Sequence, residues 1–288
     1  MTASPAAWTD QAERSNIAVL RLMRWIAVTL GRRVSRGVLH PIALYFLLAG
    51  GPAPRASRDY LRRALGRPPR WIERYREDYA VFARIRLGGA STFESMGLDV
   101  FSIMMYEDPD LVKEVHRRFS EWSARVVQHL NKMDFDFIWA NDDHADTKAP
   151  WINMEMWEEF FKPYQMMVAK EIKKPWIFHS DGNLFPILDG LLQLGMNGVH
   201  PVQPSAMDIN QLKAKYGQRV CIVGNIDLDY TLPRGTEAEV EAEVRDRIEK
   251  VGKGGGYMIS SANSITDYCK VENVRAMSRA IRKYGKYA

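Results

Sequence analysis

The stretch KPWIFHSDGN, residues 174–183, has the pattern of a buried strand that ends abruptly in polar residues. Trp176, Ile177 and Phe178 form a short apolar run, which is typical of a strand covered on both faces of a parallel sheet. His179 and Asp181 follow, and the glycine after them lets the chain leave the strand sharply. This pattern predicts a strand that presents an imidazole and a carboxylate at its carboxyl end.

The same order of strand, polar end and helix recurs through the rest of the chain. Strands are predicted at 135–142, 174–182, 198–204, 220–227 and 255–265, and helices at 108–133, 153–172, 184–195, 207–217, 236–252 and 270–285. Strands that alternate with helices at this spacing imply a parallel sheet with crossover helices.

Each predicted strand ends in polar or small residues. In a (β/α)8 barrel the carboxyl ends of all strands meet at one mouth, whereas in an open doubly wound sheet they meet only at a switch point. Because every predicted end is polar, we expect an α/β fold of the (β/α)8 TIM-barrel type. The candidate residues at this mouth are His179, Asp181, Asp142 and Asp143 for catalysis, and His144, His200, Gln203, Asn225, Asp227 and Asn263 for substrate binding.

Each of these assignments has a structural alternative. The Asp142 and Asp143 carboxylates could raise one pKa enough for acid catalysis or bind a cation, but could equally cap a helix after the strand. His179 could instead bond to a neighbouring loop, and the GNID segment at 224–227 also suits an ordinary strand-to-helix turn. The sequence leaves these alternatives open.

The net charge of +5 conceals two different parts of the chain. Residues 1–89 hold sixteen Arg, no Lys and six acidic residues, a net charge of +10. Residues 90–288 hold twenty-four basic and twenty-nine acidic residues, a net charge of −5. The basic character therefore belongs to the first part, and the absence of a nucleic-acid-binding motif argues against a nucleic-acid partner.

Residues 1–89 read as an Arg-rich helical segment. Residues 17–49 combine apolar stretches with arginines, so they suit either peripheral contact with a membrane surface or a core helix with a solvated arginine face. The longest apolar run, 38–51, is too short to span a bilayer, and the first residues lack a signal-peptide core. Two widely separated cysteines, Cys221 and Cys269, fit a reducing compartment, so we expect a cytoplasmic protein.

The segment LHPIALYFLLAGGPAPRASRDYLRRALGRPPRW, residues 39–71, carries a first family resemblance. Through it, residues 15–85 resemble the amino-terminal part of the lipid A lauroyl/myristoyl acyltransferases. The resemblance ends before the part of that family that carries out acyl transfer.

A second resemblance covers residues 90–288 and rests on several segments in order. They are TFESMGLDVFSIMMYEDPDLV, DFIWANDDHADTKAPWINMEMWEEFFKPY, FHSDGN, GMNGVHPVQP, YGQRVCIVGNIDLDYTL, GTEAEVEAEV, GGYMISSANSI and ENVRAM. Together they resemble the uroporphyrinogen decarboxylase superfamily, which includes methyltransferases that serve corrinoid proteins. The resemblance implies a (β/α)8 barrel of which only the last five or six strands are present.

The resemblance implies different sites for the two branches. Where the decarboxylase has Gly-His-Gly-Ile at its last strand, this chain has Ala262 to Ile265, with Asn263 in place of the histidine, and residues 1–89 contain no segment like the arginine-bearing RQAGR. The methyltransferases hold zinc with His-x-Cys and a later Cys. Here His179 is kept and Asp181 takes the first Cys position, so His179 and Asp181 are the implied metal ligands, with fewer charged thiolates than zinc normally has there.

Three hypotheses follow. The first is an enzyme that transfers a methyl group from a small methylated substrate to a corrinoid protein, by O- or N-demethylation, with a divalent metal such as zinc as cofactor. The second is a uroporphyrinogen decarboxylase of tetrapyrrole biosynthesis. The third is an inactive chimera of two gene fragments joined near residue 87, where the composition and the resemblance both change. An incomplete barrel exposes sheet edges, which invites a homodimer.

Overall fold

The computed structural model describes residues 25, 82–133 and 135–285. The chain divides between Tyr79 and Ala80 into two compact units, and every described residue except Trp25 belongs to the second. The acyltransferase-like segment therefore lies outside the described residues, apart from Trp25 and residues 82–85. The expected membrane contact of residues 17–49 also lies outside them, apart from Trp25. No helix in the described part of the chain is both long enough and apolar enough to cross a membrane.

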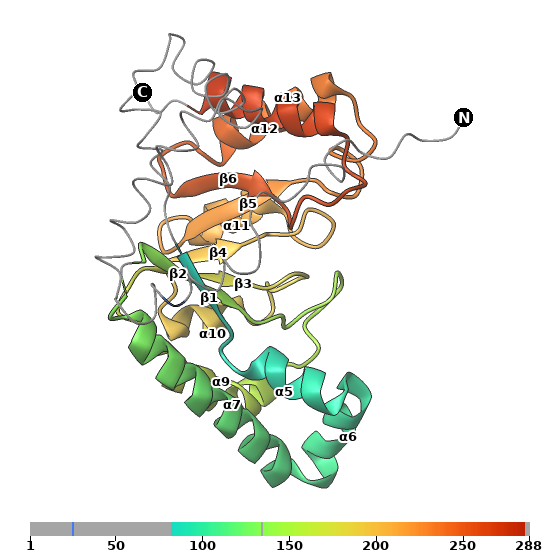
Figure 1. The fold of residues 1–288 in the computed structure, drawn as a ribbon. Helices are drawn as coiled ribbons and strands as arrows, with labels where there is room; N and C mark the ends of the chain where they lie inside the picture. Colours follow the sequence, from blue (N-terminus) through green and yellow to red (C-terminus); the bar gives the residue numbers. More distant parts are fainter. Residues whose placement is uncertain (1–24, 26–81, 134, 286–288) are drawn as a thin grey trace. The chain divides into compact units, whose positions relative to one another are not determined.

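The centre of the second unit is one sheet of six parallel strands, in the order in which they occur along the chain (Figure 1). The strands are β1 (Phe82–Ile85), β2 (Phe137–Asn141), β3 (Trp176–His179), β4 (Gly198–His200), β5 (Cys221–Ile226) and β6 (Tyr257–Ser261). Neighbouring strands that are consecutive and parallel, each joined through a helix, make up the repeating unit of a (β/α)8 barrel.

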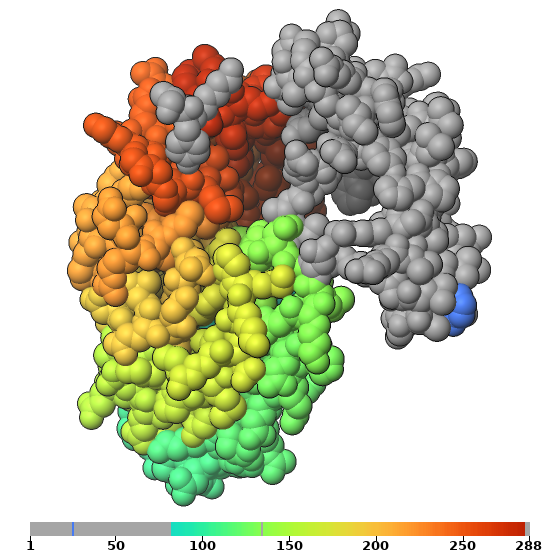
Figure 2. All heavy atoms as spheres, turned by 90° about the vertical axis from the view of Figure 1, so that its left-hand side faces the viewer, coloured from blue at the N-terminus to red at the C-terminus, as the bar shows by residue number. Residues whose placement is uncertain are grey.

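Helices connect the strands, and Figure 2 shows the successive β/α units as bands of colour. Their bounds are α5 (Gly89–Met96), α6 (Leu98–Glu107), α7 (Pro109–Leu130), α8 (Met154–Phe160), α9 (Lys162–Ala169), α10 (Leu188–Leu191) with the 3₁₀ turn η1 (Leu192–Leu194), α11 (Ile209–Tyr216), α12 (Glu237–Lys250) and α13 (Val271–Tyr284). Helix α7 packs on α9, and α12 packs on α13.

The α/β fold class and the incomplete barrel are confirmed. In the described part of the chain nothing pairs with the outer edge of β1 or of β6, so the sheet is open. The strand β1 precedes residue 89, where the sequence predicts the boundary between the two parts. The homodimer expected from the open edges stays a prediction.

Side chains alternate between the two faces of the sheet, as they must along a strand. Ala83, Ile85, Ile138, Ala140 and Phe178 are buried. The residues between them lie on the opposite face, which we call the inner face because it faces the interior in a closed barrel. It is partly open, since Phe82 on this face is 48% exposed.

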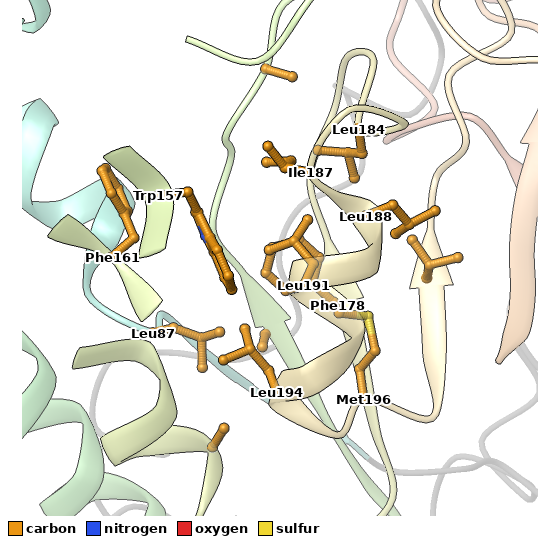
Figure 3. Packing of buried hydrophobic residues seen from close by; sticks show 14 of the residues in the cluster. Leu87, Trp157, Phe161, Phe178, Leu184, Ile187, Leu188, Leu191, Leu194 and Met196 are labelled. Carbon is orange, nitrogen blue, oxygen red and sulfur yellow. The ribbon is translucent and has the colours of Figure 1, made fainter. Parts of the chain in front are cut away.

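The core lies between the other face of the sheet and the helices. Trp157 of α8 is fully buried, and it approaches α10 so closely that a Cβ added at Gly190 would lie 2.8 Å from its ring. Figure 3 shows Trp157 among the leucines and Ile187 of the same cluster. Each large apolar side chain buried this completely contributes about 1.5–3 kcal/mol to folding, so this cluster fixes the helix layer against the strands.

Polar side chains set the beginnings of several helices. Asp108 accepts a hydrogen bond from the backbone N–H of Leu111 at 3.0 Å, and Pro109 occupies the first turn of α7. Thr236 and Glu239 form a reciprocal capping box at α12. These local signals explain why the predicted helices begin close to the observed ones.

His116 of α7 is a histidine of the core rather than of the inner face. Its Nδ1 lies 2.8 Å from the carbonyl oxygen of Phe160, and its ring packs against Phe161 and Tyr164. Burial disfavours the charged imidazole and lowers the pKa of His116 from 6.5 to about 4.

This burial predicts a pH-dependent contribution to stability. Because the folded-state pKa lies below that of the unfolded chain, the unfolded state binds more protons between pH 6.5 and about 4. His116 should therefore cost up to roughly 3 kcal/mol of the free energy of unfolding as the pH falls through this window. Urea unfolding of the wild type and of His116→Asn, measured at pH 7 and pH 4, should give two stabilities that converge at the lower pH. Parallel pH profiles would contradict the assignment.

Candidate functional site

Three side chains meet on the inner face where β2 and β3 end. Asp143, His179 and Asp181 each offer one ligand atom, and these atoms lie within 4.8 Å of one another. The Nε2 atom of His179 is 3.9 Å from Oδ1 of Asp143. The structure thus brings together three of the four residues predicted to be catalytic, and we call them the triad.

Hydrogen bonds hold the two carboxylates of the triad in place. The backbone N–H of Asp181 donates to Oδ1 of Asp143 at 3.0 Å, so the loop after β3 is tied to the loop after β2. The side-chain amide of Asn263, beyond β6, donates to Oδ2 of Asp181 at 2.8 Å. Asn263 therefore reaches across the end of the sheet and fixes the orientation of a triad carboxylate.

Burial, and to a lesser extent the nearby Asp143 carboxylate, raises the pKa of the Asp181 carboxyl to about 6. The hydrogen bond from Asn263 acts in the opposite direction. A carboxyl group with a pKa near 6 can hold or release a proton near neutral pH, which suits acid–base catalysis.

His179 and His200 stack side by side at the ends of β3 and β4. Their ring centroids are 4.9 Å apart, and their Nδ1 atoms are separated by 2.7 Å. Burial lowers the pKa of both imidazoles, that of His200 to about 3. Trp139 of β2 covers them, with its ring centroid 4.7 Å from that of His200.

A cleft of about 270 Å³ adjoins the triad. Asp181, Gln203, Asp227, Asp229 and Asn263 are among the residues that line it. Gln203 accepts a hydrogen bond from the Gly182 N–H at 3.0 Å, which places its amide beside the loop after β3. Three predicted substrate-binding residues, Gln203, Asp227 and Asn263, therefore line one cleft with a triad carboxylate. None of the described residues that line it is basic.

Asp142 lies on the opposite face of the sheet from the triad. It is fully buried and accepts hydrogen bonds from the N–H groups of Gly89 and Ala90, at 3.1 and 2.6 Å, and from Gln165 at 2.8 Å. Burial raises the pKa of its carboxyl to about 6. These contacts hold the first turn of α5, a helix that precedes β2, and not a helix after the strand as the capping alternative had it.

His144 lies on the same side as Asp142. Its ring is stacked on Phe178 and its Nε2 is 2.7 Å from the Gln165 amide nitrogen. Burial lowers the pKa of His144 to about 3. The structure therefore places this predicted substrate-binding residue in the helix layer, away from the cleft.

Asn225 and Asp227 hold the backbone at the end of β5. The amide of Asn225 donates to the Val202 carbonyl at 2.6 Å, and its oxygen accepts from Arg247 at 2.9 Å. The Asp227 carboxylate accepts from three backbone N–H groups of the following turn, those of Asp229, Tyr230 and Thr231. The turn predicted for the GNID segment is thus present, while Asp227 also borders the cleft.

Two residues of the inner face, Arg84 and Asn141, were not among the site residues predicted from the sequence. Arg84 of β1 donates to the side-chain oxygen of Asn141, at the end of β2. Arg84 lies in this short strand and Arg86 lies just beyond its end, so the two arginines alternate with apolar residues within the Arg-rich part of the chain. That alternation is the signal that could have identified both the strand and its inward arginine.

The triad offers a donor set for a divalent metal ion. Two carboxylates and an imidazole on one side leave coordination positions open for water or a substrate. The bond between His179 and His200 is of the kind that fixes a metal-binding histidine. The residues present therefore fit a cation such as zinc, with Asp143 joining the two ligands that the sequence implied.

Comparison with known proteins decides the family. The family model described as "Uroporphyrinogen decarboxylase (URO-D)" matches residues 81–284. The chain belongs to the uroporphyrinogen decarboxylase family. The family match begins one residue before β1, so the whole sheet lies within it.

Curated relatives in the family bear the name uroporphyrinogen decarboxylase. The protein from Tolumonas auensis is 24% identical over 194 residues, which cover 63% of this chain and 50% of that protein. The protein from Trichodesmium erythraeum is 26% identical over 178 residues, covering 59% of this chain and 47% of that one. This chain thus spans about half the length of the curated relatives it matches.

A solved structure supports the fold. A methyltransferase from Methanosarcina mazei superimposes with a TM-score of 0.64 at 20% identity, covering 74% of this chain and 61% of that protein. The similarity confirms the barrel-like arrangement within the uroporphyrinogen decarboxylase family, and it shows the fold alone.

Gly182 gives the loop of the triad its shape, and this can be tested. Its φ is +84°, and a Cβ there would lie 2.4 Å from the Asp146 carbonyl oxygen. Gly195 has the same conformation, with a φ of +86°, but nothing lies within 4 Å of an added Cβ. Gly195→Ala should cost about 1–2 kcal/mol of the free energy of unfolding through backbone strain alone.

Gly182→Ala should cost about 1–3 kcal/mol more than Gly195→Ala, because the new methyl group also meets backbone atoms that cannot move aside. Denaturant unfolding of both variants measures the difference. Equal losses would show that the loop after β3 accommodates a side chain at this position.

Proposed function

We propose that this member of the uroporphyrinogen decarboxylase family is a metal-assisted methyltransferase. It would take a methyl group from the oxygen or nitrogen of a small methylated substrate and pass it to a corrinoid protein. The observation that carries the proposal is the triad of Asp143, His179 and Asp181 beside an acidic cleft. Cys221 and Cys269 are free thiols, in agreement with the cytoplasmic location that we infer.

The charge of the cleft favours this reaction over action on a porphyrinogen. Uroporphyrinogen carries many carboxylates, which need positively charged partners. Asp181, Asp227 and Asp229 line the cleft. Carboxylates at short range repel one another, so a neutral or cationic methylated molecule suits this cleft better than a polycarboxylate.

The triad residues would divide the chemistry between them. Asp143, His179 and Asp181 would hold a divalent cation, which when bound supplies a Lewis acid for the heteroatom that leaves the methyl group. As the bond from carbon to that heteroatom breaks, its electron pair stays on the heteroatom. The acceptor supplies the pair for the new bond. Asn263 keeps the Asp181 carboxyl turned toward the cleft during this exchange.

Uroporphyrinogen decarboxylation is the second candidate, and one observation favours it. Arg84 of β1 lies on the inner face, close enough to bond with Asn141, and Arg86 follows two residues later. Arginine is well suited to bind carboxylates because its guanidinium group donates in pairs. The curated relatives bear the name of this activity.

Metal binding tests the triad directly. The full chain, freed of metal with a chelator, is titrated with Co²⁺ and followed by its visible absorption. Loss of a residue that only supports a metal ligand lowers metal affinity about 10- to 100-fold, and loss of a ligand itself should lower it more. We therefore expect Asp143→Asn, His179→Gln and Asp181→Asn each to lower Co²⁺ affinity at least about 100-fold. Asp229→Asn, in the same cleft but outside the triad, is the control and should bind as the wild type does. Equal affinity in all five proteins would contradict the site.

A paired assay separates the two reactions. The protein is incubated with a methoxy or methylamine substrate and reduced cobalamin, and separately with uroporphyrinogen, with methylcobalamin and coproporphyrinogen as the products measured. We expect methylcobalamin to form. Its yield should be at least about 100-fold lower in His179→Gln, which is the loss expected when a metal ligand is removed. Coproporphyrinogen alone would favour the decarboxylase, and failure of both reactions across the substrates tried would favour the inactive chimera.

A further inference from the structure

We propose that the outer face of α6 is a docking surface for a second protein, one whose own surface has an apolar centre and a basic rim. The surface is formed by Val100, Ile103 and Tyr106, and we call it the α6 patch. It does not rest on the proposed function, because exposure, charge and position in the fold carry it.

Helix α6 is more apolar than an exposed helix normally is. Its sequence is LDVFSIMMYE, in which seven of ten residues are apolar or aromatic. A helix that is apolar all round is usually buried on all sides. In α6 the buried side chains are Phe101 and Met105, whereas Ile103 is 53% exposed and Tyr106 is 78% exposed. The sequence of α6 therefore fits a second contact that the described part of the chain does not supply.

The exposed apolar side chains of α6 lie together. Val100, Ile103 and Tyr106 follow one another at three-residue intervals, a spacing that makes side chains neighbours on a helix. They occupy the face opposite Phe101 and Met105, which join the core. Single exposed apolar residues are normal on a protein surface, whereas a contiguous apolar set indicates a site of interaction.

The α6 patch belongs to an addition at the carboxyl end of the sheet. β1 ends at Ile85 and α5 begins at Gly89, so the chain enters α5 and α6 from the end of the strands that carries the triad (Figure 1). A β/α unit needs one returning helix, and α7, with 22 residues, is that helix. The pair α5 and α6 is therefore an extra element between a strand and its returning helix.

An aromatic contact joins this helix pair to the loop after β2. The ring of Trp151 packs edge-to-face on that of Phe93 in α5, with centroids 4.6 Å apart. The same loop carries Asp143 of the triad. A protein bound to the α6 patch would thus stand beside the functional end of the sheet.

The charge around the α6 patch selects its partner. Residues 98–111 contain four acidic residues and no basic one. Asp99 and Glu107 are exposed and alternate with the apolar residues of the patch along α6. Opposite charges across an interface steer association, and like charges that face each other oppose it. The complementary surface therefore carries lysines or arginines around an apolar centre.

The same acidic residues argue against two other occupants. In a two-fold dimer formed through this patch, equivalent surfaces would meet, and the acidic side chains of one copy would face those of the other. Apolar helices that bind a membrane surface are rich in Lys and Arg on their polar side, and residues 98–111 have neither. A different protein with a basic amphipathic surface fits the patch better than either.

Two labelled peptides test the chemistry of the surface. Both form amphipathic helices with a leucine face; one is flanked by lysines and the other by glutamates. Each is titrated with the full chain and followed by fluorescence anisotropy. We expect the lysine peptide to bind at least about tenfold more tightly at low salt, and this preference to shrink as salt is added. Equal binding of the two peptides would overturn the charge selection.

Substitutions on exposed side chains test the location. Ile103→Ser should weaken binding of the lysine peptide about tenfold, because Ile103 lies at the centre of the patch. Val271→Ser is the matched control, since Val271 is a β-branched residue of α13 that is 60% exposed, and it should bind as the wild type does. Glu107→Gln should reduce the preference for the lysine peptide. The same affinity in wild type and Ile103→Ser would overturn the location.

Sedimentation separates the occupants. Wild type and Ile103→Ser are compared by sedimentation velocity, and each is spun with vesicles of phosphatidylcholine or phosphatidylglycerol. We expect the same oligomeric state in both proteins and no α6-dependent binding to vesicles. A dimer that Ile103→Ser dissociates would assign the patch to a second copy, and vesicle binding lost in Ile103→Ser would assign it to a membrane. Either result would overturn the proposal, whatever the Co²⁺ titration shows of the triad.

Discussion

The alternation of side chains across the ends of β2 and β3 is the constraint on which the site depends. Asp142 and Asp143 are neighbours in sequence, yet they point to opposite faces of the sheet. One carboxylate holds the first turn of α5 in the helix layer, and the other joins His179 and Asp181 on the inner face. A shift of the strand by one residue would exchange these roles and remove the triad.

The sequence predicted the features that follow from period and composition. The short apolar run before His179 and the polar ends of the strands were enough to indicate parallel β/α units with a shared functional edge, and they placed His179, Asp181 and Asp143 correctly at that edge. The separation of Asp142 from Asp143 could not be predicted, because it depends on the residue at which the strand begins to pair. Gln165 gave no signal, since a glutamine within a helix is ordinary until the fold places it beside a buried carboxylate.

A polar contact between distant strands ties the site together across the open sheet. Asn263 bonds to Asp181 although β6 is three strands away from β3 in the sheet. The loop after the last strand therefore supports a triad carboxylate, and Asn263 places an amide donor beside an acidic group.

The position of the triad along the chain decides how much of a barrel its donor set needs. All three donors lie between residues 143 and 181, on two adjacent β/α units whose strands pair directly. Local pairing and one turn bring the three donors together, and the bond from Asn263 then orients one of them, without closure of a complete cylinder. The donor set therefore needs only neighbouring β/α units of the sheet and the loop after β6, so an open sheet can present it as a closed barrel would.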